Sequence, residues 1–194
     1  MNKTRMEAFT DAIIAIIMTI LVLSLSIPQK SSLSALFTMK EEFLIYILSF
    51  FLLAAYWINH HHLLQIADRI NGQALWLNTI MLFFMTLIPF TTRWLTQYYN
   101  YLVPSITYGV IFFTINIFYF TLQEALIKAN GKDSDIYKLL KNDKKARVSI
   151  FLSLVAILLG FIIPILTPVF CFLIAILWII PSKSIEKTIK NKKI

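Results

Sequence analysis

The sequence predicts an all-α fold, a polytopic membrane protein with six transmembrane helices. Hydrophobic residues make up 58% of the chain and charged residues only 14%, and the mean hydropathy is +0.73. Soluble domains are about half apolar and about a quarter charged. Apolar segments of the length that crosses a bilayer, about 20 residues, also recur along the chain. We therefore expect residues 1–194 to form a single six-helix transmembrane domain.

The first four spans are read directly from apolar runs: Met6–Ile27, Phe43–Leu64, Ala74–Leu95 and Pro104–Ile127. Pro28 closes the first run because a proline cannot continue a helix. A short amphipathic link, Ser31–Lys40, precedes the second run and is expected to lie at the membrane surface. Three tyrosines precede the fourth run, as is typical of an aromatic belt at the membrane interface: Tyr98, Tyr99 and Tyr101.

The last apolar run, Val148–Ile180, is too long for one span. As a single helix it would measure about 50 Å, well beyond the hydrocarbon core of about 30 Å. Pro164 and Pro168 interrupt it near its middle, which predicts two short helices joined by a tight turn. The polar loop that precedes this run, residues 128–147, contains enough helix formers for a short helix at Ile136–Lys141.

The positive charges predict the orientation. All but three of the 18 Lys and Arg residues lie on one side of a six-span topology, in the N-terminus, two loops and the tail; the exceptions are Lys30, Lys40 and Arg93. Positive residues are retained on the cytosolic side, so both termini, the loop 128–147 and the basic tail 182–194 are expected there. Five spans would place the tail outside. Topology thus explains the net charge of +8 without a nucleic-acid partner.

The first span is unusual because Arg5, Phe9 and Asp11 lie at its N-terminal end. A charge at the end of a membrane helix costs free energy unless it is paired or hydrated. These residues therefore either anchor the span at the membrane interface or belong to a functional site or a set of contacts that holds helices together. Further along the helix, four side chains share one stripe at i, i+3, i+4 and i+7: Ile16, Thr19, Ile20 and Leu23. Such a stripe is usually a packing face, and from sequence it could equally face lipid or a pore.

The second span carries Trp57 and three consecutive histidines, His60 to His62. Consecutive residues point about 100° apart on a helix, so these histidines cannot jointly bind one metal ion. We expect hydrogen bonds between helices and no cofactor or metal. Four glycines and the absence of a glycine-rich phosphate loop or a pair of buried carboxylates argue against an enzyme. The single Cys171 excludes an intrachain disulfide framework.

Several of these residues match one known pattern. The run Arg5-x-x-x-Phe9-Thr10-Asp11, followed by an apolar helix that ends in proline, resembles the first-helix signature of the transmembrane protein 175 family of potassium channels. The family has serine where this chain has Thr10, so the hydroxyl is kept. Trp57-x-x-His60-His61, Asn78 and Pro89-Phe90 also resemble the family pattern.

The resemblance implies a homotetramer around a central pore that the first helix lines, with potassium as the permeant ion. It implies a constriction at Ile16, with Thr19, Ile20 and Leu23 further along the pore. It also implies a structural polar network made of Arg5, Phe9, Thr10, Asp11, Trp57, His60 or His61, and Asn78. An apolar ring gates by dewetting, so a hydrophobic gate with weak selectivity for potassium, and permeability to caesium, is expected.

Two other functions remain open at this point. A secondary transporter uses broken helices or titratable groups near the midplane, and the only broken region expected here is Pro164–Pro168. A membrane assembly protein without transport activity is the other alternative. The Lys-, Ile- and Asn-rich composition is typical of a prokaryotic protein and indicates the cell membrane.

Overall fold

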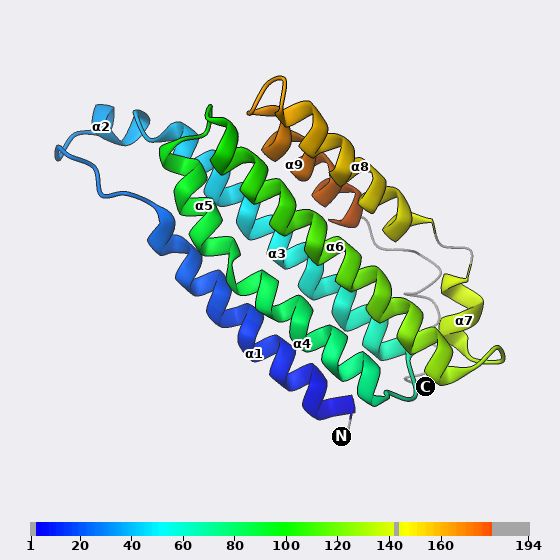
Figure 1. Ribbon diagram of the computed structural model, residues 1–194. Helices are drawn as coiled ribbons and strands as arrows, with labels where there is room; N and C mark the ends of the chain where they lie inside the picture. The colour runs from blue at the N-terminus through cyan, green and yellow to red at the C-terminus, as the bar shows by residue number, and fades with distance from the viewer. Residues whose placement is uncertain (1–2, 142–143, 180–194) are drawn as a thin grey trace.

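A computed structural model describes residues 3–141 and 144–179, and this part of the chain is entirely helical apart from turns and loops (Figure 1). The elements are α1 (Lys3–Leu21), the 3-10 turn η1 (Val22–Ser24), α2 (Leu33–Phe37), α3 (Lys40–Ile66), α4 (Gly72–Thr86), α5 (Ile88–Gln97), α6 (Leu102–Asn130), α7 (Asp135–Leu140), α8 (Lys145–Gly160) and α9 (Leu166–Ile179). The prediction of an all-α chain is confirmed for these residues. The tail 182–194 lies outside them.

Four segments of the described chain are long and apolar enough to cross a bilayer: Lys3–Ser24, Lys40–Ile66, Gly72–Gln97 and Leu102–Asn130. They form a bundle in which α1 packs on α3, α4 and α5 and α6 packs on α4 and α5, and the α8–α9 hairpin packs beside α6 and α3 (Figure 1). With 16 and 14 residues, α8 and α9 measure about 24 and 21 Å, less than the hydrocarbon thickness of about 30 Å. Among the described residues, four segments are thus long enough to cross the bilayer, and the last apolar run forms a pair of shorter helices, as predicted.

The first span ends earlier than predicted. Helix α1 stops at Leu21, η1 continues to Ser24, and Leu25 is extended with φ −77° and ψ 138°. The backbone N–H of Ser26 donates to Oε2 of Glu42 at 3.0 Å instead of to a helical carbonyl. A residue before proline avoids the helical region, so Pro28 disfavours helix at Ile27 and the chain leaves the span before it.

The third span is broken, which the sequence analysis did not predict. Its residues form two helices, α4 and α5, that meet at Leu87. The cause is Pro89, near the start of α5: it has no N–H to donate, and its ring would collide with the carbonyl of Met85. In the fourth span, by contrast, Pro104 lies in the first turn of α6, where the missing N–H costs nothing.

The α8–α9 hairpin follows the prediction that prolines divide the last apolar run. Pro164 lies in the turn between the helices, whereas Pro168 lies in the first turn of α9. Thr167 Oγ1 donates to the Ala156 carbonyl at 3.2 Å. A Cβ atom added at Gly109 of α6 or at Gly160 of α8 would collide with Thr167. Glycine at both positions thus lets three helices approach closely.

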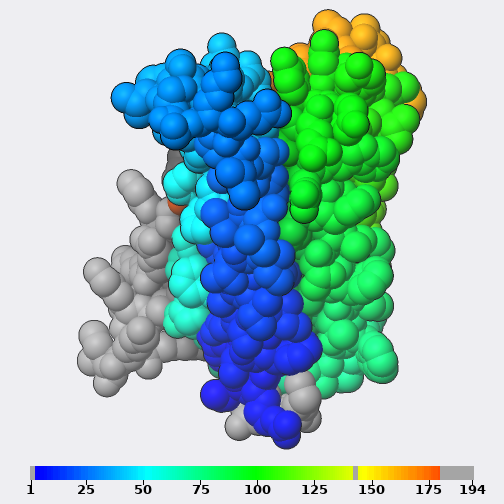
Figure 2. Space-filling model, turned by 90° about the vertical axis from the view of Figure 1, so that its left-hand side faces the viewer, coloured from blue at the N-terminus to red at the C-terminus, as the bar shows by residue number. Residues whose placement is uncertain are grey.

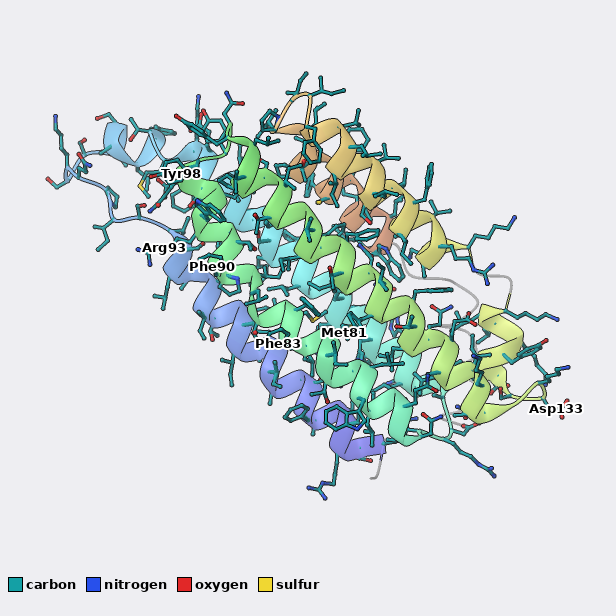
Figure 3. All side chains as sticks on the ribbon, in the orientation of Figure 1. Met81, Phe83, Phe90, Arg93, Tyr98 and Asp133 are labelled. Atoms are coloured by element: carbon teal, nitrogen blue, oxygen red, sulfur yellow. The ribbon has the colours of Figure 1, made fainter. Side chains whose placement is uncertain are left out.

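The core lies between α1, α3, α4 and α6, and its largest fully buried side chains include Tyr108, Phe112, Leu53 and Met81. Figure 3 labels Met81 within the bundle and Phe83, two residues on, which is 57% exposed. Cys171 is buried in this core. The predicted short helix in the loop 128–147 is present as α7.

Buried hydroxyl groups also join the helices. Thr92 Oγ1 donates to Ser49 Oγ at 2.8 Å, and Ser49 Oγ lies 3.1 Å from the Tyr108 hydroxyl. These contacts connect α5, α3 and α6, and they satisfy polar groups that would be costly to leave unpaired inside the bundle.

Candidate functional site

Helix α1 has two different faces. One face packs against α3, α4 and α5 and buries Met6, Ile14 and Ile17. On the other face the predicted stripe is exposed along the whole helix: Ile16 is 57% exposed, Ile20 45% and Leu23 68%, with Thr19 also exposed. Figure 2 shows α1 running up the surface of the molecule. The stripe therefore is not a packing face within the described part of the chain.

The buried face of α1 is joined to α3 and α4 by a chain of hydrogen bonds. Asn78 Nδ2 donates to Thr10 Oγ1 at 2.9 Å, and Thr10 Oγ1 donates to the Met6 carbonyl at 2.9 Å. His60 Nε2 lies 2.8 Å from Asn78 Oδ1. Since the Asn78 amide nitrogen is the donor to Thr10, its oxygen accepts, and His60 carries its proton on Nε2. Thr10, Asn78 and His60 are at most 2% exposed.

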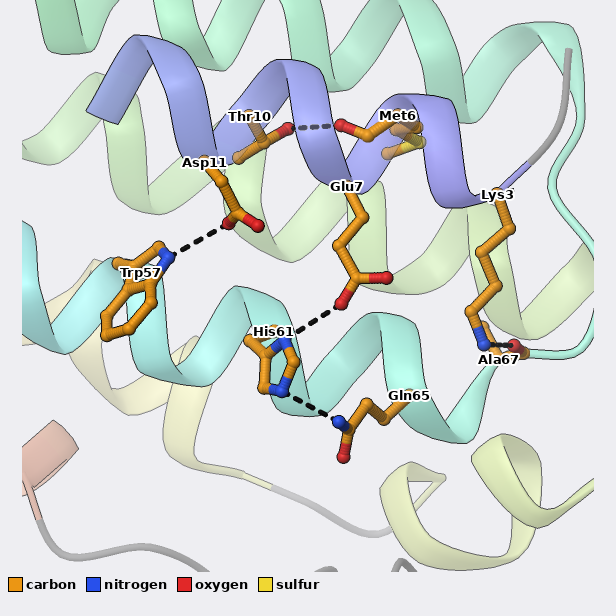
Figure 4. A network of polar contacts seen from close by, with 9 residues as sticks. All are labelled: Lys3, Met6, Glu7, Thr10, Asp11, Trp57, His61, Gln65 and Ala67. Atoms are coloured by element: carbon orange, nitrogen blue, oxygen red, sulfur yellow. Dashed lines mark hydrogen bonds and ion pairs between the residues drawn. The ribbon is translucent and has the colours of Figure 1, made fainter. Parts of the chain in front are cut away.

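A second contact joins α1 to α3 nearer the surface. The indole Nε1 of Trp57 donates to Oδ1 of Asp11 at 2.9 Å (Figure 4). A hydrogen bond to a carboxylate is stronger than one between neutral groups. Asp11 therefore turns toward α3, away from the exposed stripe.

A third set of contacts lies one turn closer to the N-terminus. Nδ1 of His61 lies 2.8 Å from Oε1 of Glu7, and its Nε2 lies 2.7 Å from Nε2 of Gln65. One turn further, Lys3 Nζ donates to the Ala67 carbonyl at 2.8 Å. Figure 4 shows these contacts in a row between α1 and the C-terminal half of α3. Both histidines left open by the sequence thus take part, His60 toward α4 and His61 toward α1.

The structure does not bring every predicted residue together. Arg5 and Phe9 are exposed, and among residues 3–141 and 144–179 no hydrogen bond or ion pair joins Arg5 to another side chain. Conversely, sequence reasoning missed Glu7 and Lys3. A signal was present, because Lys3, Glu7 and Asp11 recur every four residues and so share one face of a helix.

These contacts fix how α1 is rotated about its axis. Hydrogen bonds between membrane helices contribute about 0.6 kcal/mol each on average, with a maximum near 1.7. Each bond is modest, but together the contacts of Thr10, Asp11 and Glu7 direct one side of α1 inward. The opposite side, with the Ile16 stripe, is then held outward along the entire span. Within the described residues, no group of three His, Cys, Asp or Glu side chains could hold a metal ion.

Fold and site together define a multi-pass α-helical membrane protein whose first helix is anchored on one face and exposes an apolar stripe on the other. Residues 5–89 match the profile of the family described as the endosomal/lysosomal potassium channel TMEM175. A potassium channel of Chryseobacterium sp. (strain P1-3) is 37% identical over 98% of this chain and 100% of its own length. The chain belongs to the TMEM175 (transmembrane protein 175) family.

A solved structure supports the same assignment. The crystal structure of a lysosomal potassium-selective channel TMEM175 homolog from Chamaesiphon minutus matches with a TM-score of 0.81 at 29% sequence identity, over 91% of this chain and 95% of that one. The endosomal/lysosomal proton channel TMEM175 of Danio rerio is 27% identical over 67% of this chain, which spans 25% of that protein. The predicted family is confirmed, and because it is a family of ion channels, so is the prediction that the chain is not an enzyme.

Proposed function

We propose that this protein is a potassium-permeable channel of the cell membrane in which four copies surround a central pore lined by the exposed face of α1. The observation that carries the proposal is the apolar stripe of Ile16, Ile20 and Leu23, held outward along a span whose other face is anchored to α3 and α4. The similarity of the chain to potassium channels of Chryseobacterium and Chamaesiphon supports potassium as the permeant ion.

We place the constriction at Ile16. A ring of four isoleucine side chains offers no oxygen ligands, so an ion that passes it loses hydration without compensation. The larger ions potassium and caesium lose hydration at lower cost than sodium, which gives a weak preference for them. Thr19 Oγ1 donates its hydrogen to the Ile16 carbonyl at 2.8 Å, and its lone pairs are left to face the ion.

The exposed face of α1 favours potassium over protons as the main permeant ion. From Phe9 to Leu23 this face carries no titratable side chain. The nearest carboxylates, Glu7 and Asp11, are engaged by His61 and Trp57 on the side toward α3. The α1 stripe therefore offers no titratable side chains that could relay protons.

For the topology we propose that α8 and α9 complete six crossings and that both termini, the loop 128–147 and the tail 182–194 are cytosolic. The strong excess of Lys and Arg on that side supports this orientation. The shortness of α8 is compatible with local thinning of the bilayer around it.

The test is the reversal potential of the purified protein in planar bilayers with potassium on one side and sodium on the other. We expect a shift toward the potassium equilibrium potential. In Ile16→Asn, a wetted constriction raises sodium permeability and moves the reversal potential toward zero. The same substitution at an exposed position of α8, Leu158→Asn, leaves it unchanged. An unaltered ratio in Ile16→Asn would refute the constriction, and no current from folded oligomers would favour a transporter or an assembly protein.

A further inference from the structure

The segment between α1 and α3, residues 25–39, forms an arm with unusually exposed apolar side chains. Ile27 is 90% exposed, Leu33 76% and Phe37 75%. Figure 1 shows the arm, with α2, projecting from the end of the bundle opposite the N-terminus. An open groove of about 540 Å³ lies between the arm and the start of α3, near Glu42. Met39 at the end of the arm is buried, but the bundle leaves Ile27, Leu33 and Phe37 uncovered, and exposed apolar side chains of this kind are typical of an interaction site.

A pocket that could receive these side chains lies on α5. It has a volume of about 260 Å³ and is lined by Phe90, Arg93, Trp94 and Gln97. Phe90 is 63% exposed, and its ring lies 6.0 Å from the ring of Trp94, so two aromatic rings form the wall. Figure 3 places Phe90 and Arg93 at the same end of the bundle as the arm.

The arm and the pocket lie on opposite flanks of α1. Figure 2 looks onto α1, with the arm above and to its left and with α5 to its right. When the exposed face of α1 points to a central axis, the left flank of one copy meets the right flank of the next. Contacts between two different surfaces of identical chains close into a ring when the rotation allows it.

We propose that the arm of each copy docks into the α5 pocket of the neighbouring copy and closes the oligomer at the end opposite the N-terminus. The Phe37 side chain packs against the exposed sides of the Phe90 and Trp94 rings, where aromatic rings pair favourably, and the Arg93 guanidinium covers the docked ring from the rim. Only the 3-10 turn η1 separates the arm from α1. The arm therefore connects the end of the pore-lining helix of one copy to α5 of the next. This inference rests on the proposed oligomeric channel.

Cysteine cross-linking tests the contact. In a Cys171→Ala background the double variant Phe37→Cys/Phe90→Cys is reconstituted in vesicles and oxidised. A disulfide needs Cβ atoms about 3.8 Å apart, so it forms only where the two positions meet. Both positions are exposed, so the substitutions leave the core intact. The matched control is Phe37→Cys/Leu158→Cys, which moves the second thiol to the exposed face of α8.

On a denaturing gel, the expected result is a shift of the protein band from monomer to cross-linked dimer, trimer and tetramer. The shift is reversed by reductant and is absent in the control. Co-expression of the two single variants should give a dimer only, because each chain then carries one thiol. The oligomer could instead form and conduct while no cross-link appears in the double variant or between the co-expressed single variants. If a fluorophore at position 37 is then quenched by brominated lipid, the arm lies on the bilayer. The docking proposal is then wrong while the channel stands. If the unsubstituted protein, shown to be folded, forms no oligomer and passes no current, both proposals are wrong.

Discussion

Replacing Asn78 with alanine removes two hydrogen bonds, one from α4 to Thr10 of α1 and one between α4 and His60 of α3. Interhelical hydrogen bonds in a membrane contribute about 0.6 kcal/mol on average and at most about 1.7. Thr10 keeps its bond to the Met6 carbonyl, whereas His60 Nε2 is left buried and unpaired, which adds to the cost. We therefore expect Asn78→Ala to lower the free energy of unfolding by about 2–3 kcal/mol.

The matched control is Thr79→Ala, one residue along the same helix. Thr79 is exposed, and its hydroxyl donates at 2.9 Å to the Leu75 carbonyl within α4, so the change should stay within about 0.5 kcal/mol. Both are measured by reversible unfolding in mixed micelles. A combined Thr10→Ala/Asn78→Ala variant should lose less than the sum of the two single variants. A loss for Asn78→Ala no larger than the control would show that these bonds do not hold α1.

Further substitutions probe the close packing at Thr167 and the Glu7–His61 pair. Gly109→Ala and Gly160→Ala each place a Cβ against Thr167, and forced repacking of this kind costs about 1–3 kcal/mol. The control Gly72→Ala, where a Cβ meets nothing within 4 Å, should be nearly neutral. Equal melting temperatures for all three variants in detergent would contradict the close approach of the helices at Thr167. His61→Phe should cost less than about 1 kcal/mol, because the Glu7–His61 pair is partly exposed. A loss as large as that of Asn78→Ala would mean that the pair is shielded from solvent.

Much of the fold was available from the sequence because a bilayer imposes a simple rule on length and polarity. Apolar runs of about 20 residues predicted the four long spans, since a helix is the way to satisfy backbone groups in lipid. The short helix α7 and the division of the last run at Pro164 were also predicted. The break at Leu87 and the early end of α1 were not. Each depends on how a proline is tolerated locally, which hydropathy does not report.

For the site, the sequence by itself determined which residues are unusual. Charged and polar side chains in a membrane span need partners, and Asp11 and the histidines at 60–62 were identified on that ground, whereas Trp57 entered the network through the family resemblance. Only the tertiary structure decided the partners. It paired His60 with Asn78 and His61 with Glu7, and it left Arg5 exposed. The physical reason is that periodicity reports which residues share a face, whereas the neighbour of that face depends on the packing of α1 between α3, α4 and α5.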